Sequence, residues 1–66
     1  MAITLNGKPH DVSGSPTIIE LVDSLSVNGN QVAVAVNGEV VRRTDWPETR
    51  VRDGDSVEVV RAVGGG

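Results

Sequence analysis

The sequence predicts an α+β fold in which one helix covers one face of a mixed sheet of about five strands. Short segments of alternating apolar and polar residues are separated by turn dipeptides, Asn-Gly at residues 6–7 and 37–38 and Asp-Gly at residues 53–54. One segment, residues 17–25, has instead the three-and-four-residue apolar spacing of an amphipathic helix. With 66 residues, the chain has room for one domain and one core.

The N-terminal segment AITLNGKPHDV, residues 2–12, is predicted to form a β-hairpin. Ile3 and Leu5 alternate with polar neighbours, and the Asn-Gly dipeptide supplies the turn. Val12 returns an apolar side chain from the second strand. The turn-forming segment SGSP at residues 13–16 then ends this strand.

The segment TIIELVDSL predicts one helix of roughly two turns. Its apolar stripe consists of Ile18, Leu21, Val22 and Leu25. Thr17 and Glu20 have the spacing of a capping box, although Ser15 followed by Pro16 is a competing start. Gly29 suits a left-handed C-cap, so the helix is expected to close there.

The C-terminal half predicts three more strands. In QVAVAVNGEVVRR, residues 31–43, three valines alternate with two alanines before an Asn-Gly turn and a short strand at residues 39–41. The connection TDWPETRVRDGD contains Trp46, which is expected to fill the core because large aromatic side chains dominate small cores. The last strand, SVEVVRAV, turns Val57 and Val59 to one side and Glu58 and Val60 to the other.

The element order β-β-α-β-β-β predicts how the strands are arranged. A right-handed crossover through the helix places the first and last strands near the centre of the sheet as parallel neighbours. This arrangement is the β-grasp, or ubiquitin-like, topology. Residues 1–63 are predicted to form the domain and residues 64–66 a flexible glycine tail. Because one helix covers one face, the opposite face, with Val60 and the alanines of VAVAV, is predicted to be a docking surface.

Composition excludes several classes of function. A net charge of −3 and a single aromatic residue, a tryptophan, disfavour binding to nucleic acid. The chain has no cysteine and one histidine, His10, so disulfides, thiolate metal sites and a paired-histidine site are excluded. No Ser-His-Asp set is apparent that so small a core could align. Without a basic, apolar leader or a stretch of membrane-spanning length, we expect a cytoplasmic protein with no membrane contact.

The sequence resembles the ThiS family of sulfur carriers of thiamine biosynthesis over its whole length. The most specific parts are the AVNGEVV hairpin, the RRTDW segment, the DGD turn before the last strand, and the terminal Gly-Gly. The resemblance implies a protein carrier rather than an enzyme, with no cofactor of its own. In the family, a ubiquitin-activating-like adenylyltransferase of the ThiF type uses ATP to adenylate the terminal glycine, here Gly66. A sulfur donor such as a cysteine desulfurase then produces a C-terminal thiocarboxylate, and a ThiG-type thiazole synthase takes the sulfur.

The chemistry of such a carrier accounts for the terminal glycines. A carboxylate does not react with a sulfur donor until it has become a mixed anhydride, and both steps take place in a partner's closed pocket. Three extended residues reach roughly 10 Å, and glycine has no Cβ to block a narrow channel. The predicted site has Gly66 as the modified residue. The residues predicted to contact partners are Gly64, Gly65, Val60, Ala62, Val63, Arg42 and Arg43.

Three alternatives remain open on the sequence. One alternative is that four arginines form only a solvated rim of the domain: Arg42, Arg43, Arg50 and Arg52. A related thiocarboxylate carrier could supply molybdopterin or cysteine synthesis instead of thiazole formation. A β-grasp module that acts purely in protein interaction would not need a free C-terminal carboxylate.

Overall fold

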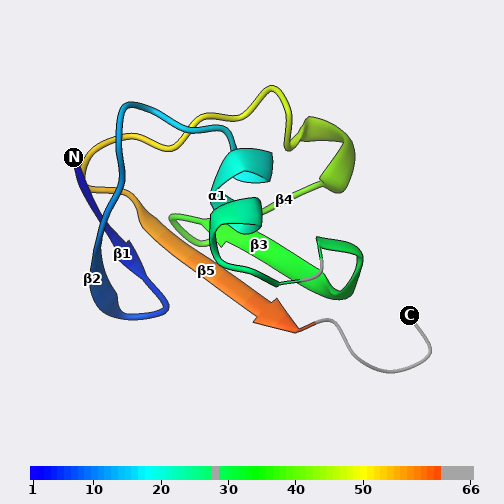
Figure 1. Cartoon of the computed structure of the whole chain (residues 1–66). Coiled ribbons are helices and arrows are strands. Elements are labelled where there is room, and N and C mark those ends of the chain that lie inside the picture. The colour runs from blue at the N-terminus through cyan, green and yellow to red at the C-terminus, as the bar shows by residue number, and fades with distance from the viewer. Residues whose placement is uncertain (28, 62–66) are drawn as a thin grey trace.

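The computed structural model describes residues 1–27 and 29–61. Its elements are β1 (Ala2–Leu5), β2 (Lys8–Asp11), α1 (Ile18–Ser24), the 3-10 helix η1 (Gly29–Gln31), β3 (Val32–Val36), β4 (Glu39–Val41), the 3-10 helix η2 (Arg43–Asp45) and β5 (Ser56–Arg61). The five strands form one sheet in the order β2-β1-β5-β3-β4 (Figure 1). β1 and β5 are parallel, and the other neighbours are antiparallel. The predicted α+β class and the central pair of first and last strands are confirmed.

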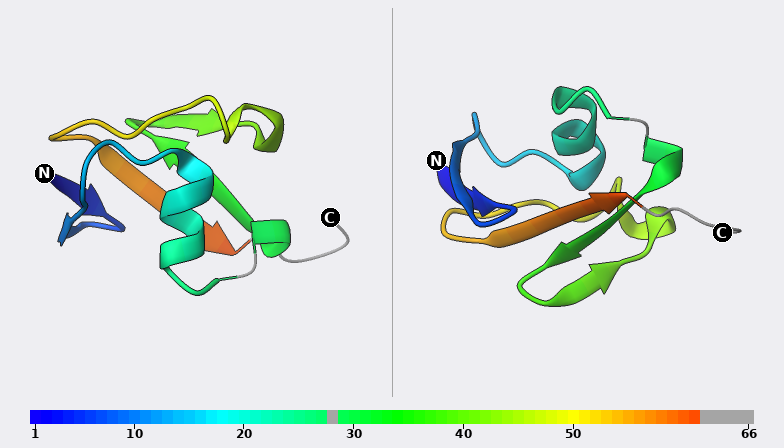
Figure 2. Two further views of the ribbon diagram at one scale, coloured as in Figure 1. Left: turned by 45° about the horizontal axis from the view of Figure 1, so that its top comes forward. Right: turned by 90° about the horizontal axis from the view of Figure 1, so that it is seen from below.

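The sheet and the helix form two layers. α1 crosses one face of the sheet, and in the described part of the chain the opposite face carries no helix (Figure 2). The predicted strand orientation is confirmed, because Val57 is fully buried against the helix layer whereas Val60 is 56% exposed. Among residues 1–27 and 29–61, no helix has the length and apolar character needed to span a membrane.

Two tight Asn-Gly turns form the two hairpins. Asn6 and Gly7 have φ values of 50° and 82°, and Asn37 and Gly38 have φ values of 51° and 86°. Positive φ at both central residues defines a type I′ turn, whose twist matches that of the flanking strands. Both predicted hairpins are therefore confirmed, with Leu5 opposite Lys8 and Val36 opposite Glu39.

A capping box starts α1. The Thr17 hydroxyl accepts a hydrogen bond from the Glu20 amide at 3.2 Å, and the Thr17 amide donates to Glu20 Oε1 at 2.8 Å. This confirms the Thr17 start over the Ser15-Pro16 alternative. The predicted cap at Gly29 is wrong: Leu25 is the C-cap, and Ser26 adopts a left-handed φ of 58°. The apolar stripe ends at Leu25, so the chain turns away before it reaches the glycine, which lies in η1.

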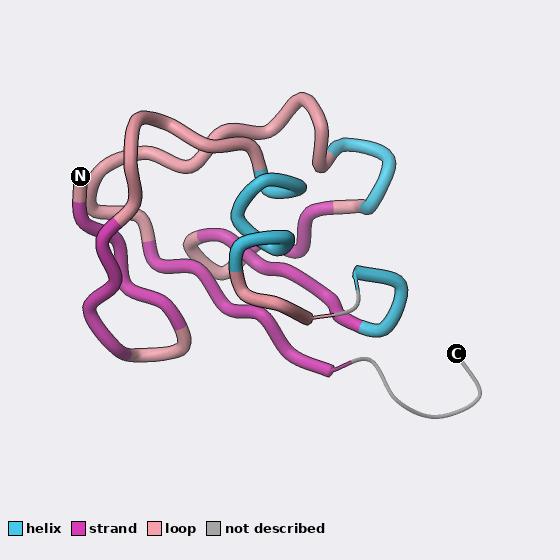
Figure 3. Tube along the Cα trace, viewed as in Figure 1, coloured by secondary structure: helices cyan, strands magenta, loops and turns pink. Residues whose placement is uncertain are grey.

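One cluster of side chains forms the core between α1 and the sheet. Its buried members are Ile3, Ile18, Leu21, Val22, Val32, Val34, Trp46, Val51 and Val57. The predicted role of Trp46 is confirmed, since the residue is 4% exposed and its Nε1–H donates to the Val41 carbonyl at 3.0 Å. The long connection between η2 and β5 (Figure 3) adds Val51, whose amide donates to the Pro16 carbonyl at 2.9 Å. This connection therefore closes the core beside the start of the helix.

Candidate functional site

Most of the predicted site lies outside the described residues. Ala62, Val63, Gly64, Gly65 and Gly66 all follow the last described residue, Arg61. The predicted division into a domain of residues 1–63 and a tail of residues 64–66 also falls in this part. The structure does describe the base of the site, which is β5 and the side chains around it.

β5 is held differently along its two edges. Along β3 its antiparallel pairing continues to the end of the strand, where Arg61 lies opposite Val32. Along β1 the parallel pairing covers only Ser56 and Val57, because β1 then enters its turn. The strand that leads to the predicted tail therefore runs past the end of β1.

The two turn asparagines add bonds to the backbone of β5. Asn6 Oδ1 accepts from the Val59 amide at 2.8 Å, and its Nδ2 donates to the Val59 carbonyl at 3.2 Å. Asn37 Oδ1 accepts from the Ser56 amide at 2.9 Å, and its Nδ2 donates to Asp55 Oδ1 at 3.1 Å. Sequence reasoning recognised both asparagines only as turn residues. The available signal was the choice of Asn, whose carboxamide both donates and accepts.

The uncovered face of the sheet carries an apolar patch, here called the open-face patch. Its members are Ala33, Ala35, Val40 and Val60. The register places Ala33 opposite Val60, and Ala35 opposite both Val40 and Glu58. Val40 is 75% exposed and Val60 is 56% exposed. The sequence predicted Val60 and the alanines at this face but missed Val40, whose three-residue strand is too short to show a clear alternation.

The two predicted arginines lie at the edge of the sheet beyond β4. The Arg43 guanidinium lies over the Trp46 ring, 5.2 Å from its centroid, and donates to Asn30 Oδ1 at 3.3 Å and to the Val32 carbonyl at 3.4 Å. Arg43 thus packs on its own domain by a cation–π contact. Arg42 is exposed, and its carbonyl accepts from the Asp45 amide at 2.8 Å. Contact of either arginine with a partner stays a prediction.

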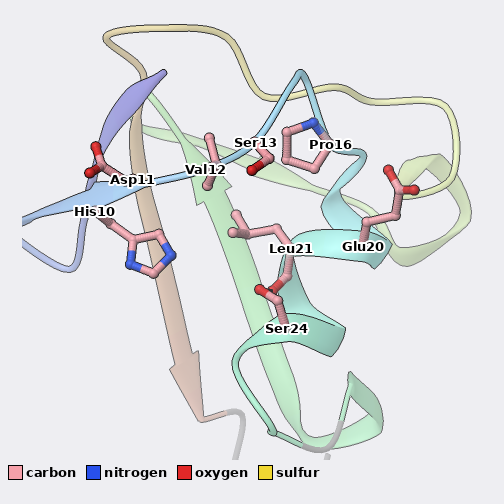
Figure 4. A pocket seen from close by; sticks show the side chains of 8 residues that line it. All are labelled: His10, Asp11, Val12, Ser13, Pro16, Glu20, Leu21 and Ser24. Atoms are coloured by element: carbon pink, nitrogen blue, oxygen red, sulfur yellow. Dashed lines mark hydrogen bonds between the residues drawn. The ribbon is translucent and has the colours of Figure 1, made fainter.

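A hollow of about 400 Å³ lies between β2 and α1 on the helix side of the sheet (Figure 4). Its walls are His10, Asp11, Val12, Ser13, Pro16, Glu20, Leu21 and Ser24. In Figure 4, His10 and Glu20 lie on either side of Leu21, and the labelled side chains lie away from the described end of β5. The Glu20 carboxylate is engaged by Thr17, whose backbone N–H lowers the pKa of Glu20 below its ordinary value of 4.5. The hollow therefore does not belong to the predicted site.

The described residues hold no group of three or more His, Cys, Asp or Glu side chains placed to bind a metal ion. The topology, the single helix and the exposed sheet face define a small β-grasp protein of the ubiquitin-like class. The chain belongs to the ThiS family, whose family model matches residues 3–66.

Comparison with individual proteins agrees with this family. The crystal structure of the thiamine biosynthesis protein ThiS from Geobacter metallireducens is 42% identical, covers 100% of both chains and superposes with a TM-score of 0.89. The sulfur carrier protein ThiS of Thermus thermophilus is 38% identical over 64 residues, which are 97% of this chain and 98% of that protein. These matches confirm the predicted β-grasp fold and the family. The predicted class, a protein carrier, is confirmed by the ThiS relatives of Thermus thermophilus and Escherichia coli, which are named sulfur carrier proteins.

A longer protein contains a similar segment. The thiazole synthase of Paramagnetospirillum magneticum is 36% identical over 66 residues, which are 100% of this chain but 20% of that protein. The chain thus spans about a fifth of the length of this curated relative.

Proposed function

We propose that the chain carries sulfur as a thiocarboxylate on Gly66 and delivers it for thiazole formation in thiamine biosynthesis. Its membership of the ThiS family supports the coarser part, a sulfur carrier in thiamine biosynthesis, and this match is the observation that carries the proposal. The finer part rests on the chemistry that three consecutive glycines allow at residues 64–66.

The reaction proposed for Gly66 has three steps. A carboxylate oxygen attacks the α-phosphorus of ATP, pyrophosphate leaves, and an acyl-adenylate forms. The terminal sulfur of a donor persulfide then attacks the acyl carbon, so that AMP leaves with one former carboxylate oxygen and an acyl disulfide forms. A second thiol cleaves the S–S bond of this acyl disulfide, which releases the thiocarboxylate and leaves a disulfide between that thiol and the donor. The chain contributes the acyl group and its delivery, while an adenylyltransferase contributes the ATP site.

The proposed partners follow from these steps. A ThiF-type adenylyltransferase activates Gly66, a cysteine desulfurase supplies sulfur, and a ThiG-type thiazole synthase accepts it. The thiazole synthase link is supported by the Paramagnetospirillum magneticum protein, which contains a segment similar to this whole chain. The open-face patch is proposed as the surface that docks on the adenylyltransferase, because it is exposed and its member Val60 lies one residue before Arg61, the end of β5. The proposed place of action is the cytoplasm.

The test uses the chain with the ThiF-type adenylyltransferase of the same organism. We expect ATP–pyrophosphate exchange that depends on the chain, and, after addition of a sulfur donor, the intact-mass gain of one sulfur replacing one oxygen. Transfer of this sulfur to thiazole synthase, and not to a molybdopterin or cysteine acceptor, would identify the pathway.

Two variants serve as controls for this test. One lacks Gly66, and the other carries one additional residue after it. Both variants should keep the melting temperature of the wild type. Both should lose ATP–pyrophosphate exchange, because the terminal carboxylate of Gly66 is absent in one and no longer free in the other. Undiminished exchange by the extended variant would contradict the proposal.

A further inference from the structure

The C-terminal half of β5 has lost its strand neighbour on one edge. β1 pairs with Ser56 and Val57 and then turns at Asn6, so Val59 lies beyond the last paired residue of β1. If the parallel pairing continued, backbone groups of two further residues of β1 would bond to the Val59 amide and carbonyl. The group that bonds to Val59 at this edge therefore determines how firmly β5 is held near the point where it leads into residues 62–66.

The side chain of Asn6 occupies that position. Its carboxamide accepts from the Val59 amide at 2.8 Å and donates to the Val59 carbonyl at 3.2 Å, and so pairs with both backbone groups that β1 leaves without a partner on this edge. The Asn6 backbone amide donates to the Val57 carbonyl at 2.9 Å. One turn residue therefore makes three hydrogen bonds to β5, and two of them lie past the end of β1.

We propose that Asn6 is a positioning residue for the carrier reaction. Its carboxamide extends the sheet by one residue and holds the backbone of β5 at Val59, the base from which residues 62–66 continue. With Val59 held in this way, β5 loses less conformational freedom when the adenylyltransferase binds, which lowers the entropic cost of binding. This inference rests on the proposed function.

The chain offers a matched control in the other hairpin. Asn37 has the same type I′ position as Asn6, with φ values of 51° and 50°, and it also bonds to the backbone of β5. Its contacts are with Ser56 and Asp55, at the start of the strand. Asn6→Gly and Asn37→Gly both retain a residue that accepts positive φ, and both remove a carboxamide that braces β5. The two variants differ in which end of β5 they release.

The experiment measures two quantities for each variant. The first is hydrogen exchange of the Val59 and Ser56 amides in the isolated chain. The second is the pair of constants KM and kcat for the carrier in ATP–pyrophosphate exchange with the ThiF-type adenylyltransferase. Asn6→Gly should speed hydrogen exchange of the Val59 amide about tenfold and raise KM about tenfold, because one to two hydrogen bonds are lost. The kcat of this variant should be nearly unchanged. Asn37→Gly should speed hydrogen exchange of the Ser56 amide and leave KM within about twofold of the wild-type value.

A third variant, Asn6→Asp, keeps the acceptor for the Val59 amide but cannot donate to the Val59 carbonyl at neutral pH. Its KM should fall between those of the wild type and Asn6→Gly. Equal KM changes in the two glycine variants would overturn the positioning role, because general destabilisation would then explain them. The positioning role would also be overturned if Asn6→Gly left KM unchanged, or if it left the hydrogen-exchange rate of the Val59 amide unchanged. If the wild type itself shows no ATP–pyrophosphate exchange, the proposed function fails. Hydrogen exchange of the Val59 amide then still reports whether the Asn6 side chain holds β5.

Discussion

Glu20 shows how one exposed side chain can make the stability of the domain depend on pH. The backbone N–H of Thr17 is the largest cause of its lowered pKa; desolvation acts in the opposite direction, and the Thr17 hydroxyl and the charge of Arg50 lower the pKa further. A carboxyl whose pKa is lower in the folded state adds stability above its unfolded value of 4.5. That contribution is lost as the pH falls through the lower, folded value.

The first prediction is that Glu20→Gln removes this acid dependence. Urea unfolding at about pH 6 should show the variant less stable than the wild type, because the glutamine accepts from the Thr17 amide without a charge. At an acid pH below the lowered pKa of Glu20, the two proteins should approach each other in stability, since the wild-type carboxyl is then protonated. A constant difference between the two pH values would contradict the role given to the charge.

Gly65 separates folding from function in the second prediction. A side chain at this position should block the narrow channel through which the tail enters a partner, while the described core ends with Val57 and its neighbour Val59. Gly65→Val should therefore keep the wild-type melting temperature and sharply reduce thiocarboxylate formation, measured by intact mass. Gly64→Ala, one residue nearer the domain, should have a milder effect. Equal tolerance at both positions would mean that no partner encloses the tail.

Individual residues could be predicted from the sequence where one local rule determines them. The capping box of Thr17 and Glu20 follows from spacing, and the burial of Trp46 follows from its size. The bonds of Asn6 and Asn37 to β5 could not be predicted, because they join segments that are distant in the sequence. The predicted glycine site stays a prediction, since residues 64–66 lie outside the described part of the chain.

At the scale of single elements, β5 presents one face to the core and another to solvent. Val57 and Val59 pack with the core, whereas Val60 is in register with Ala33 on the open-face patch. The third prediction is that Val60→Asp weakens binding to the adenylyltransferase by on the order of 2 kcal/mol, as expected for a residue at the centre of an interface. Its free energy of unfolding should fall by less than about 1 kcal/mol, because the side chain is exposed.

The control for this prediction is Val34→Ala on the adjacent strand. Val34 is 1% exposed, so this variant should lose about 1 to 3 kcal/mol of stability and retain wild-type affinity where it is folded. Denaturant titration and a binding titration on both variants measure the two quantities. If Val60→Asp destabilised the fold as much as Val34→Ala, the open-face patch would not be a docking surface.

The sequence predicted whole elements more accurately than their ends. Both hairpins follow from Asn-Gly turns between alternating residues, and the helix follows from its apolar stripe. The end of the helix was wrong because Gly29 offered a strong local signal, while the length of the stripe decided where the chain turned. The 3-10 helix at Arg43–Asp45 was not predicted, because it depends on packing around Trp46 rather than on a periodic pattern.

At the scale of the whole molecule, one buried cluster links α1 to strands β1, β3 and β5 and to the long connection before β5. Val22 from the helix, Val34 from the sheet and Val51 from the long connection belong to the same cluster. The fourth prediction is that the domain unfolds in a single cooperative transition. The fluorescence of Trp46 reports the core and far-UV circular dichroism reports the backbone, so their urea midpoints should coincide. Separate midpoints would indicate that the connection around Trp46 loosens before the sheet.

The strand order also determines when this protein can fold during its synthesis. In the sheet, the hairpin β1-β2 and the hairpin β3-β4 are joined only through β5, which lies between β1 and β3 and follows both hairpins in the sequence, so it is synthesised after them. A nascent or truncated chain that stops before Ser56 has both hairpins but no strand to join them, and its apolar faces stay open to proteases and chaperones. We expect cellular quality control to remove such incomplete chains, so that each folded copy contains the strand that precedes residues 62–66.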